Sequence, residues 1–376
     1  MQTLALRGPA TSDAVRNARS RFEALLSEGR RNTASVLDRI DREQPLDRVV
    51  RAGALRFEPA AHGASKIALR IGADASAVVE PLAPFALGQA TSKAGVPKTF
   101  VDDLLDPARS GWGPELLAHN LNELNAREAA DTRLLLRSVN GQVRGYLSDR
   151  YRRMDARPII GAFIEACRSV GALPLRGHVT ETRVAIKMVL DRVFEPLPGG
   201  YEMMVLGAAL TTSDFGAAPL VVSFYCERLV CLNGLIAEQG LRAVHLGARL
   251  ADDVSFSQRT YELDTATQAS AVRDLVRARL NAENIERFQG AIRAAHAAEL
   301  APGRITEFLG RALSKGDRQQ VLDAYQSPDV VMMPPGNTAY RLAQSLGYVA
   351  NKVDDDDRRL ALQKLAGEAM QLGRAA

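Results

Sequence analysis

A chain of 376 residues is long enough to bury a sizeable core and to form two or three domains. Its hydrophobic fraction of 46% and its charged fraction of 24% are those of ordinary globular proteins, which argues against wholesale disorder. The net charge of +4 is compatible with a nucleic acid, a membrane surface or neither as a partner, so charge alone excludes no class of function.

The cysteine content and the N-terminus indicate where the protein works. The chain has three cysteines, Cys167, Cys226 and Cys231. An odd and small number of cysteines is typical of reduced thiols and not of a disulfide framework. Residues 1–19 hold no apolar run that would suit a signal peptide, and a stretch of about 18 consecutive apolar residues, as a membrane span requires, occurs nowhere. We therefore expect a cytoplasmic protein without a membrane partner.

Residues 1–81 are predicted to form an N-terminal extension. Most of its first half is polar and charged, with a helix expected from Ser12 to Leu26. Leu55 to Glu58 and Lys66 to Ile71 alternate apolar and polar residues as half-buried strands do. The two strands are expected to pair as a small hairpin through a turn at Gly63.

Residues 84–106 have the pattern of two helices separated by a short turn. Pro97 suits the first turn of a helix, and Gly95 suits the close turn of a DNA-binding helix-turn-helix. Against that function, Asp102 and Asp103 would lie on the reading helix and repel phosphates. The rival interpretation is a helical hairpin packed on the core, and the sequence leaves contact with DNA open.

Residues 82–262 are predicted to form an α+β core. Arg133 to Leu147 reads as two strands around Asn140-Gly141, because this dipeptide readily takes the positive φ values of a tight hairpin turn. A helix capped by Asp155 follows, with one continuous apolar face, and Gly171 ends it.

Three more strands follow this helix: Arg183 to Leu190, Tyr201 to Leu210 and Pro219 to Val230. Because short turns join them, they are expected to form an antiparallel sheet with the helix packed across one face. From residue 263 the apolar spacing becomes helical. The fold class is therefore α+β with a helical C-terminal region over residues 263–376.

Motifs for metals, cofactors and common catalytic sites are missing from the sequence. The five histidines are scattered singly, and neither a phosphate-binding glycine loop, a GxGxxG segment nor a GxSxG elbow occurs. We expect no metal, no cofactor and no enzymatic activity. An enzyme that uses Cys231, or the carboxylates of Asp149 and Asp214, stays as the less favoured alternative.

A basic stretch with interleaved tyrosines carries the positive signal for function. Arginine on a strand and loop can hold phosphates, and aromatic rings can stack on bases, which is what a single-stranded nucleic-acid groove needs. The rival interpretation is a solvated sheet edge with Arg-Asp pairs. The predicted binding residues are Arg144, Tyr146, Arg150, Tyr151, Arg152, Arg153 and Arg157, extended on the neighbouring strand by Arg183 and Lys187.

Several motifs together resemble those of the phage/plasmid-like proteins, a large family described only as a domain of unknown function and found on prophages, plasmids and phage genomes. The resemblance extends from about Leu82 to Leu346. Its motif positions are Ser213, Asp214, Gly216, Arg228, Cys231, Asn233 and Gly234, supported by the Tyr146 to Tyr151 strand end, Gly95-Val96-Pro97 and Asn337 to Tyr340.

The resemblance implies a protein of a mobile element without an established activity. The succession of hairpin, helix and antiparallel strands is also distantly similar to the core of single-strand annealing recombinases. The leading hypothesis is a single-stranded nucleic-acid-binding protein, expected to bind and anneal DNA as a homo-oligomer. The alternative is a non-enzymatic protein-interaction or structural component of a mobile element; DNA against RNA, the oligomer size and the biological process stay open.

Overall fold

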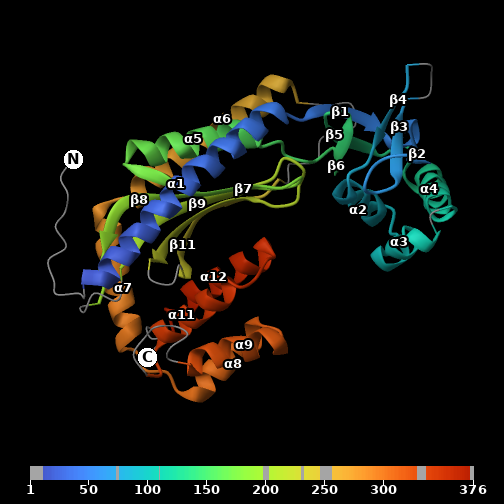
Figure 1. The fold of residues 1–376 in the computed structure, drawn as a ribbon. Helices are drawn as coiled ribbons and strands as arrows, with labels where there is room; N and C mark the ends of the chain where they lie inside the picture. The colour runs from blue at the N-terminus through green and yellow to red at the C-terminus, as the bar shows by residue number, and fades with distance from the viewer. Residues whose placement is uncertain are drawn as a thin grey trace.

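The computed structural model describes residues 12–72, 76–109, 111–197, 203–229, 233–245, 256–327 and 336–372. These residues form helices and antiparallel sheets in two parts, which Figure 1 shows beside each other. The smaller part, here called the lobe, comprises residues 46–148. The larger part, here called the body, comprises residues 12–42 and the described residues from 156 onward. The α+β class predicted from the sequence is confirmed.

The body is built on a five-stranded antiparallel sheet with the strand order β11-β10-β9-β8-β7. Its three central strands confirm the three strands predicted after the helix, whereas the two outer strands were not predicted. The sheet is regular at its centre, where Lys187 of β8 and Ser223 of β10 both pair with Ala209 of β9. The strands are β7 (Ala172–Val179), β8 (Val184–Phe194), β9 (Met204–Thr212), β10 (Leu220–Arg228) and β11 (Asn233–Ala243).

Helices cover both faces of this sheet (Figure 1). The predicted helix α5 (Ala156–Ser169) lies across one face beside α6 (Gln258–Arg279). Side chains alternate between the faces because successive residues of a strand point in opposite directions. Met188, for example, belongs to the core under α5, and the adjacent Val189 belongs to the core on the opposite face. The prediction of a helix packed across one face is confirmed.

The first helix, α1 (Ser12–Arg42), is longer than predicted and lies along the β7 edge of the sheet. Its contact with β7 is so close that a Cβ atom on Gly29 would lie 2.5 Å from the backbone of Leu175. Phe22 packs into the core on one face of the sheet and Ile40 into the core on the other. By covering β7 in this way, α1 protects an edge that could otherwise pair with another chain.

Helices make up the rest of the body, which confirms the predicted helical C-terminal region. The last two lie against β11, on the side of the sheet away from α5 (Figure 1). In the part of the chain that the structure describes, no helix is both long and apolar enough to cross a membrane. These helices are α7 (Ala282–Ala297), α8 (Pro302–Ala312), α9 (Lys315–Gln326), α11 (Ala339–Ala350) and α12 (Asp356–Ala369).

The lobe contains two three-stranded antiparallel sheets and three α-helices. The sheets have the orders β1-β5-β6 and β2-β3-β4, and the lobe has a hydrophobic core of its own. The strands are β1 (Leu46–Arg51), β2 (Leu55–Pro59), β3 (Ile67–Ile71), β4 (Val78–Pro81), β5 (Arg133–Val139) and β6 (Gln142–Ser148). The helices are α2 (Pro84–Lys93), α3 (Lys98–Leu104) and α4 (Gly113–Leu124), with short turns η1 (Ala52–Ala54), η2 (Pro107–Arg109) and η3 (Asn125–Ala129).

Both hairpins predicted from the sequence are present in the lobe. β5 and β6 meet at Asn140 and Gly141, whose φ angles of 50° and 75° are those that the turn requires. β2 and β3 pair so that Phe57 lies opposite Leu69. The helices α2 and α3 also match the predicted pair, and contact of this pair with DNA stays a prediction.

The predicted domain boundary near residue 81 differs from the observed arrangement. β1 pairs with β5 along its whole length, Leu46 opposite Ser138 and Arg51 opposite Arg133, so the predicted extension and the predicted core share one sheet. The described residues of the predicted N-terminal extension are therefore divided between α1 of the body and four strands of the lobe. This pairing joins residues about 85 positions apart in the chain, and sequence periodicity carries no information on such partners.

Candidate functional site

The predicted basic stretch runs from β6 of the lobe to the start of α5 in the body, and most of its arginines are paired there. Arg150 is the exception: it is exposed, and no carboxylate of a described residue lies within ion-pair distance of it. The other four form ion pairs: Arg144 with Glu43, Arg152 with Asp264, Arg153 with Asp47 and Arg157 with Asp41. Four of the five predicted phosphate contacts are thus already committed to carboxylates.

The predicted stacking role of the two tyrosines is incompatible with this structure. Tyr146 is 3% exposed and Tyr151 is 7% exposed, so neither ring presents a free face to a base. The Tyr151 ring instead stacks on His245, with the ring centroids 5.0 Å apart, and its hydroxyl donates to the carbonyl of Ser213. The tyrosines are buried because their rings supply apolar surface to the folded chain.

The two cations predicted on β8 also have protein partners. Arg183 donates to the carbonyl of Ala217 at 2.8 Å. The ammonium of Lys187 lies 5.0 Å above the ring of Tyr225 and donates to the side chain of Gln363. Lys187 lies on the body sheet, away from the predicted basic stretch, whereas Arg183 lies directly before β8 and lines a small pocket together with Arg144.

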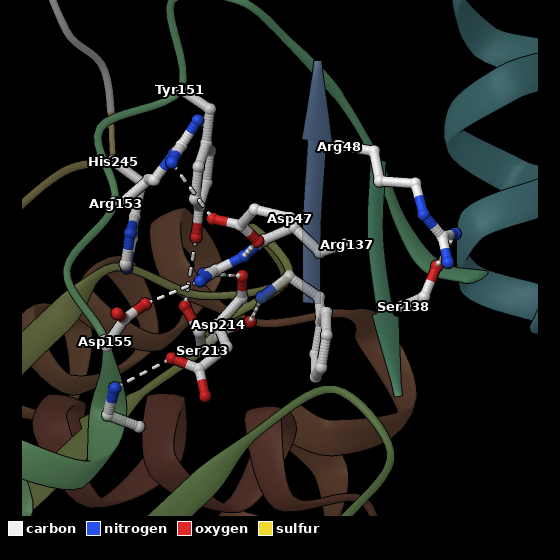
Figure 2. A network of polar contacts seen from close by, with 12 residues as sticks. Asp47, Arg48, Arg137, Ser138, Tyr151, Arg153, Asp155, Ser213, Asp214 and His245 are labelled. Atoms are coloured by element: carbon white, nitrogen blue, oxygen red, sulfur yellow. Dashed lines mark hydrogen bonds and ion pairs between the residues drawn. The ribbon is translucent and has the colours of Figure 1, made fainter. Parts of the chain in front are cut away.

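A polar network centred on Arg137 joins the lobe to the body (Figure 2). The side chain of Arg137 is buried, and each nitrogen of its guanidinium group donates to a different acceptor. Nε donates to Asp47 of β1 at 2.7 Å, Nη2 to Asp155 at 2.6 Å, and Nη1 to the carbonyl of Asp214 at 2.8 Å. Arg153 also contacts Asp47, with 3.3 Å between Nη1 and Oδ2. The network therefore links β5, β1, the chain before α5 and the turn between β9 and β10.

The motif residues Ser213, Asp214 and Gly216 shape this turn between β9 and β10. The hydroxyl of Ser213 accepts hydrogen bonds from the backbone amides two and four residues later. Gly216 has a φ of 80°, and a Cβ atom there would lie 3.0 Å from the side chain of Leu147. The carboxylate of Asp214 accepts from the amide of Ala156 and so caps α5, the function that the sequence assigned to Asp155.

The environment of Asp214 favours its protonated form. Burial raises its pKa to about 6, and the nearby guanidinium of Arg137 acts in the opposite direction. Because the folded chain binds this proton more tightly than the unfolded chain, the contribution to stability is complete at low pH. It is lost as the pH rises through about 6.

Replacement of Asp214 by asparagine is expected to remove this pH dependence. Asparagine is neutral at all pH values and keeps an oxygen that can accept from Ala156. The free energy of unfolding of Asp214→Asn relative to the wild type should rise by roughly 1–3 kcal/mol between about pH 4 and pH 7.5. Urea unfolding at several pH values measures this difference, and a difference that does not change with pH would contradict the assignment.

His245 lies beside the Arg137 network, with its ring stacked on that of Tyr151. Its Nδ1 lies 3.1 Å from the carbonyl oxygen of Arg152, so Nδ1 carries the proton and donates. Burial lowers the pKa of His245 to about 4, which keeps the ring neutral at neutral pH. The contact helps to fix the chain between β6 and α5.

The other described motif residues, Arg228, Asn233 and Gly234, lie at the end of β10 and the start of β11. Arg228 is buried at the end of β10 and pairs with Asn233, and Gly234 follows in β11. Cys231 lies outside the described residues. These positions are at the far end of the strands from the Arg137 network, because the turn after β9 lies at the opposite end of β10.

A cleft of about 950 Å³ opens on the lobe, next to the residues that follow β6. It lies between the end of α2, the turn η3 and the first residues of β5. Its inner surface includes Phe57 and Tyr146, whose ring centroids lie 6.2 Å apart. The cleft also takes in Arg150, so two of the predicted binding residues, Tyr146 and Arg150, come together here.

The cationic groups of the cleft come from separate elements. They are Lys93 at the end of α2, Arg127 in η3, Arg133 at the start of β5 and Arg150 after β6; the anionic groups are Glu128, Asp131 and Asp149. Arg127 is paired with Glu123, and Asp131 with Arg51. Lys93 forms no ion pair in the described part of the chain.

The cleft removes water from the polar groups of Lys93 and Tyr146. Loss of water around the ammonium group lowers the pKa of Lys93, and the carboxylate of Asp149 acts in the opposite direction. The hydroxyl of Tyr146 makes no hydrogen bond to a described residue, and burial raises its pKa well above the ordinary value. A partly dehydrated cation and a hydroxyl that bonds to none of the described residues could both bind an anionic ligand that accepts hydrogen bonds.

Among the described residues, the two carboxylates of the enzyme alternative line different cavities. Asp149 lines the cleft of the lobe, whereas Asp214 is buried at the junction with the body. Within the described ranges, histidine, cysteine and carboxylate side chains form no group of three that could hold a metal ion.

Sequence reasoning missed Lys93, Arg133 and Arg137. A weak signal for Arg137 is present, because a charged residue interrupts the apolar run of β5. A charge in a strand with buried residues on both sides needs a partner, so Arg137 could have been predicted as a buried ion-pair residue. Lys93 carries no such signal, since a lysine at a helix end is most often solvated.

No family model matches this sequence, and searches of curated proteins and of solved structures gave no match. The resemblance to phage/plasmid-like proteins therefore stays a prediction from the motifs.

Proposed function

We propose that this protein binds single-stranded nucleic acid, with DNA as the expected ligand, through the cleft of the lobe. The observation that carries the proposal is a pair of cations in the cleft, Lys93 and Arg150, which form no ion pair with any described residue, beside a Tyr146 hydroxyl that bonds to none of these residues. Cationic side chains that border a groove can hold a phosphate backbone without reading its sequence.

The dimensions and the lining of the cleft support a flexible strand as ligand. Its cations come from four separate elements, which are α2, η3, β5 and the chain after β6. Phe57 and Tyr146 form an apolar inner surface with one polar end, which suits the edge of a base. The tyrosines predicted to stack thus have a different role, as the floor of the cleft in the case of Tyr146 and as part of the junction in the case of Tyr151.

Annealing by an oligomer of a phage or plasmid protein is the wider form of the proposal. It rests on the motifs and on the distant similarity to annealing recombinases. Size-exclusion chromatography with and without oligonucleotide reports the assembly state. A defined oligomer that is indifferent to nucleic acid would favour the protein-interaction alternative.

Titration with a fluorescent single-stranded DNA oligonucleotide tests the proposal. Binding is expected at low salt and should weaken as salt is raised. A plot of the logarithm of the binding constant against the logarithm of the salt concentration should have a slope of about −0.7 for each phosphate that the protein neutralises. Absence of binding at low salt would overturn it.

A further inference from the structure

The lobe is an insertion in the body, connected to it by two segments of chain. Residues 43–45 lead from α1 into β1, and residues 149–155 lead from β6 into α5. All lobe elements lie between these two connections in the sequence. A unit that enters and leaves through neighbouring short segments has the connectivity of a hinged domain.

The hydrophobic cores of the lobe and the body are separate. The lobe core consists of lobe residues alone, and the two large cores of the body contain none of them. Among the described residues, no helix or strand of the lobe packs extensively on a helix or strand of the body. At the junction, Leu135 and Leu147 of the lobe form a small cluster with Tyr151 of the connection, and the ring of Phe215 from the body lies against β6 at Gly145. Hydrophobic packing therefore does little to fix the position of the lobe.

Polar contacts hold the junction instead. Arg137 of the lobe bonds to Asp155 in the connection and to the carbonyl of Asp214 in the body. Gln89 of α2 donates to the carbonyl of Phe215 in the same turn, at 2.9 Å. Directional bonds of this kind define one orientation and are lost together when the geometry changes.

We propose that the lobe is a hinged unit that moves on residues 43–45 and 149–155, and that the Arg137 network is the latch that holds it in the observed orientation. The latch acts on the lobe as a whole, because Arg137 lies in the central strand of its β1-β5-β6 sheet. The proposal concerns motion and does not depend on what the cleft binds.

Distance measurement by double electron-electron resonance tests the hinge. Spin labels are placed on Glu115→Cys in α4 of the lobe and on Arg168→Cys in α5 of the body, both at exposed positions. Cys231 is changed to serine, while Cys167 and Cys226 are buried and retained. With the latch intact, one narrow distance distribution is expected. With Arg137→Met added, the distribution should become at least about twice as wide or split into two populations.

A matched control breaks an ion pair inside the lobe. Arg48→Gln removes the contact of Arg48 with the buried carboxylate of Glu80 and should leave the distribution unchanged. A folded Arg137→Met chain with the original narrow distribution would overturn the proposal. If Arg137→Met does not fold, the double variant Asp155→Ala/Gln89→Ala removes two hydrogen bonds between the lobe and the rest of the chain and keeps the buried guanidinium. A broadened or split distribution then supports the hinge, and a narrow one overturns it.

Discussion

The double variant Lys93→Ala/Arg150→Ala is expected to bind single-stranded DNA about 100-fold more weakly than the wild type at low salt. Each cation would contribute a charge-assisted contact worth roughly 1.5 kcal/mol, and two such contacts correspond to about 100-fold in affinity. The logarithmic salt slope should fall by about 1.4, because two fewer phosphates are neutralised. Fluorescence anisotropy at several salt concentrations measures both quantities.

The control variant also removes two positive charges from the lobe, but outside the cleft. Lys98→Ala/Arg109→Ala removes two cations of the α3 region, which are paired with Asp102 and Asp103. Affinity within about threefold of the wild type is expected, since paired surface charges contribute little. Equal losses in the two variants would show that the total charge matters and the cleft does not. A larger loss in the control would favour the helix pair at residues 84–106 as the DNA contact.

Replacement of Arg137 is expected to be the most destabilising single change at the junction. Arg137→Met leaves the carboxylates of Asp47 and Asp155 without their shared cation. Asp47 keeps its contact with Arg153 and Asp155 is partly exposed, so the expected loss is about 1.5–3 kcal/mol, the range for hydrogen bonds to charged groups. Urea unfolding of the wild type and the variant at neutral pH measures the loss.

An exposed ion pair serves as the comparison for Arg137. Arg157 and Asp41 form such a pair, with both side chains more than half exposed. Arg157→Ala should change the free energy of unfolding by less than about 0.5 kcal/mol. A loss below about 1 kcal/mol for Arg137→Met would mean that the network adds little to stability and would weaken its role as a latch.

Local features of the fold were predictable because their causes are local. The turn at Asn140-Gly141 depends on backbone angles that these two residues favour. The helix α5 depends on the helical spacing of its apolar residues, which is visible in the sequence. Pairing of β1 with β5 was not predictable, because it depends on which distant strand offers the right face. The division into lobe and body follows from that pairing.

The arginine-rich stretch shows the same limit for the site. Its residue types predicted a nucleic-acid surface, yet Arg152 pairs with Asp264 and Arg153 with Asp47, each about 100 positions away in the chain. The rival interpretation was a solvated sheet edge with Arg-Asp pairs: four of the five arginines do pair with carboxylates, but only Arg144 lies on a strand. Only the fold shows that Arg150 lacks such a partner among the described residues and lies at the cleft with Lys93.

The most direct test of the central claim is to find where a bound oligonucleotide touches the chain. A single-stranded DNA containing 5-iodouracil is bound at low salt and crosslinked by light, and the modified peptides are identified by mass spectrometry. Crosslinks are predicted in peptides that contain Tyr146 and Arg150, or in those from η3 and the start of β5. Crosslinks confined to the body, with none in the lobe, would contradict the account.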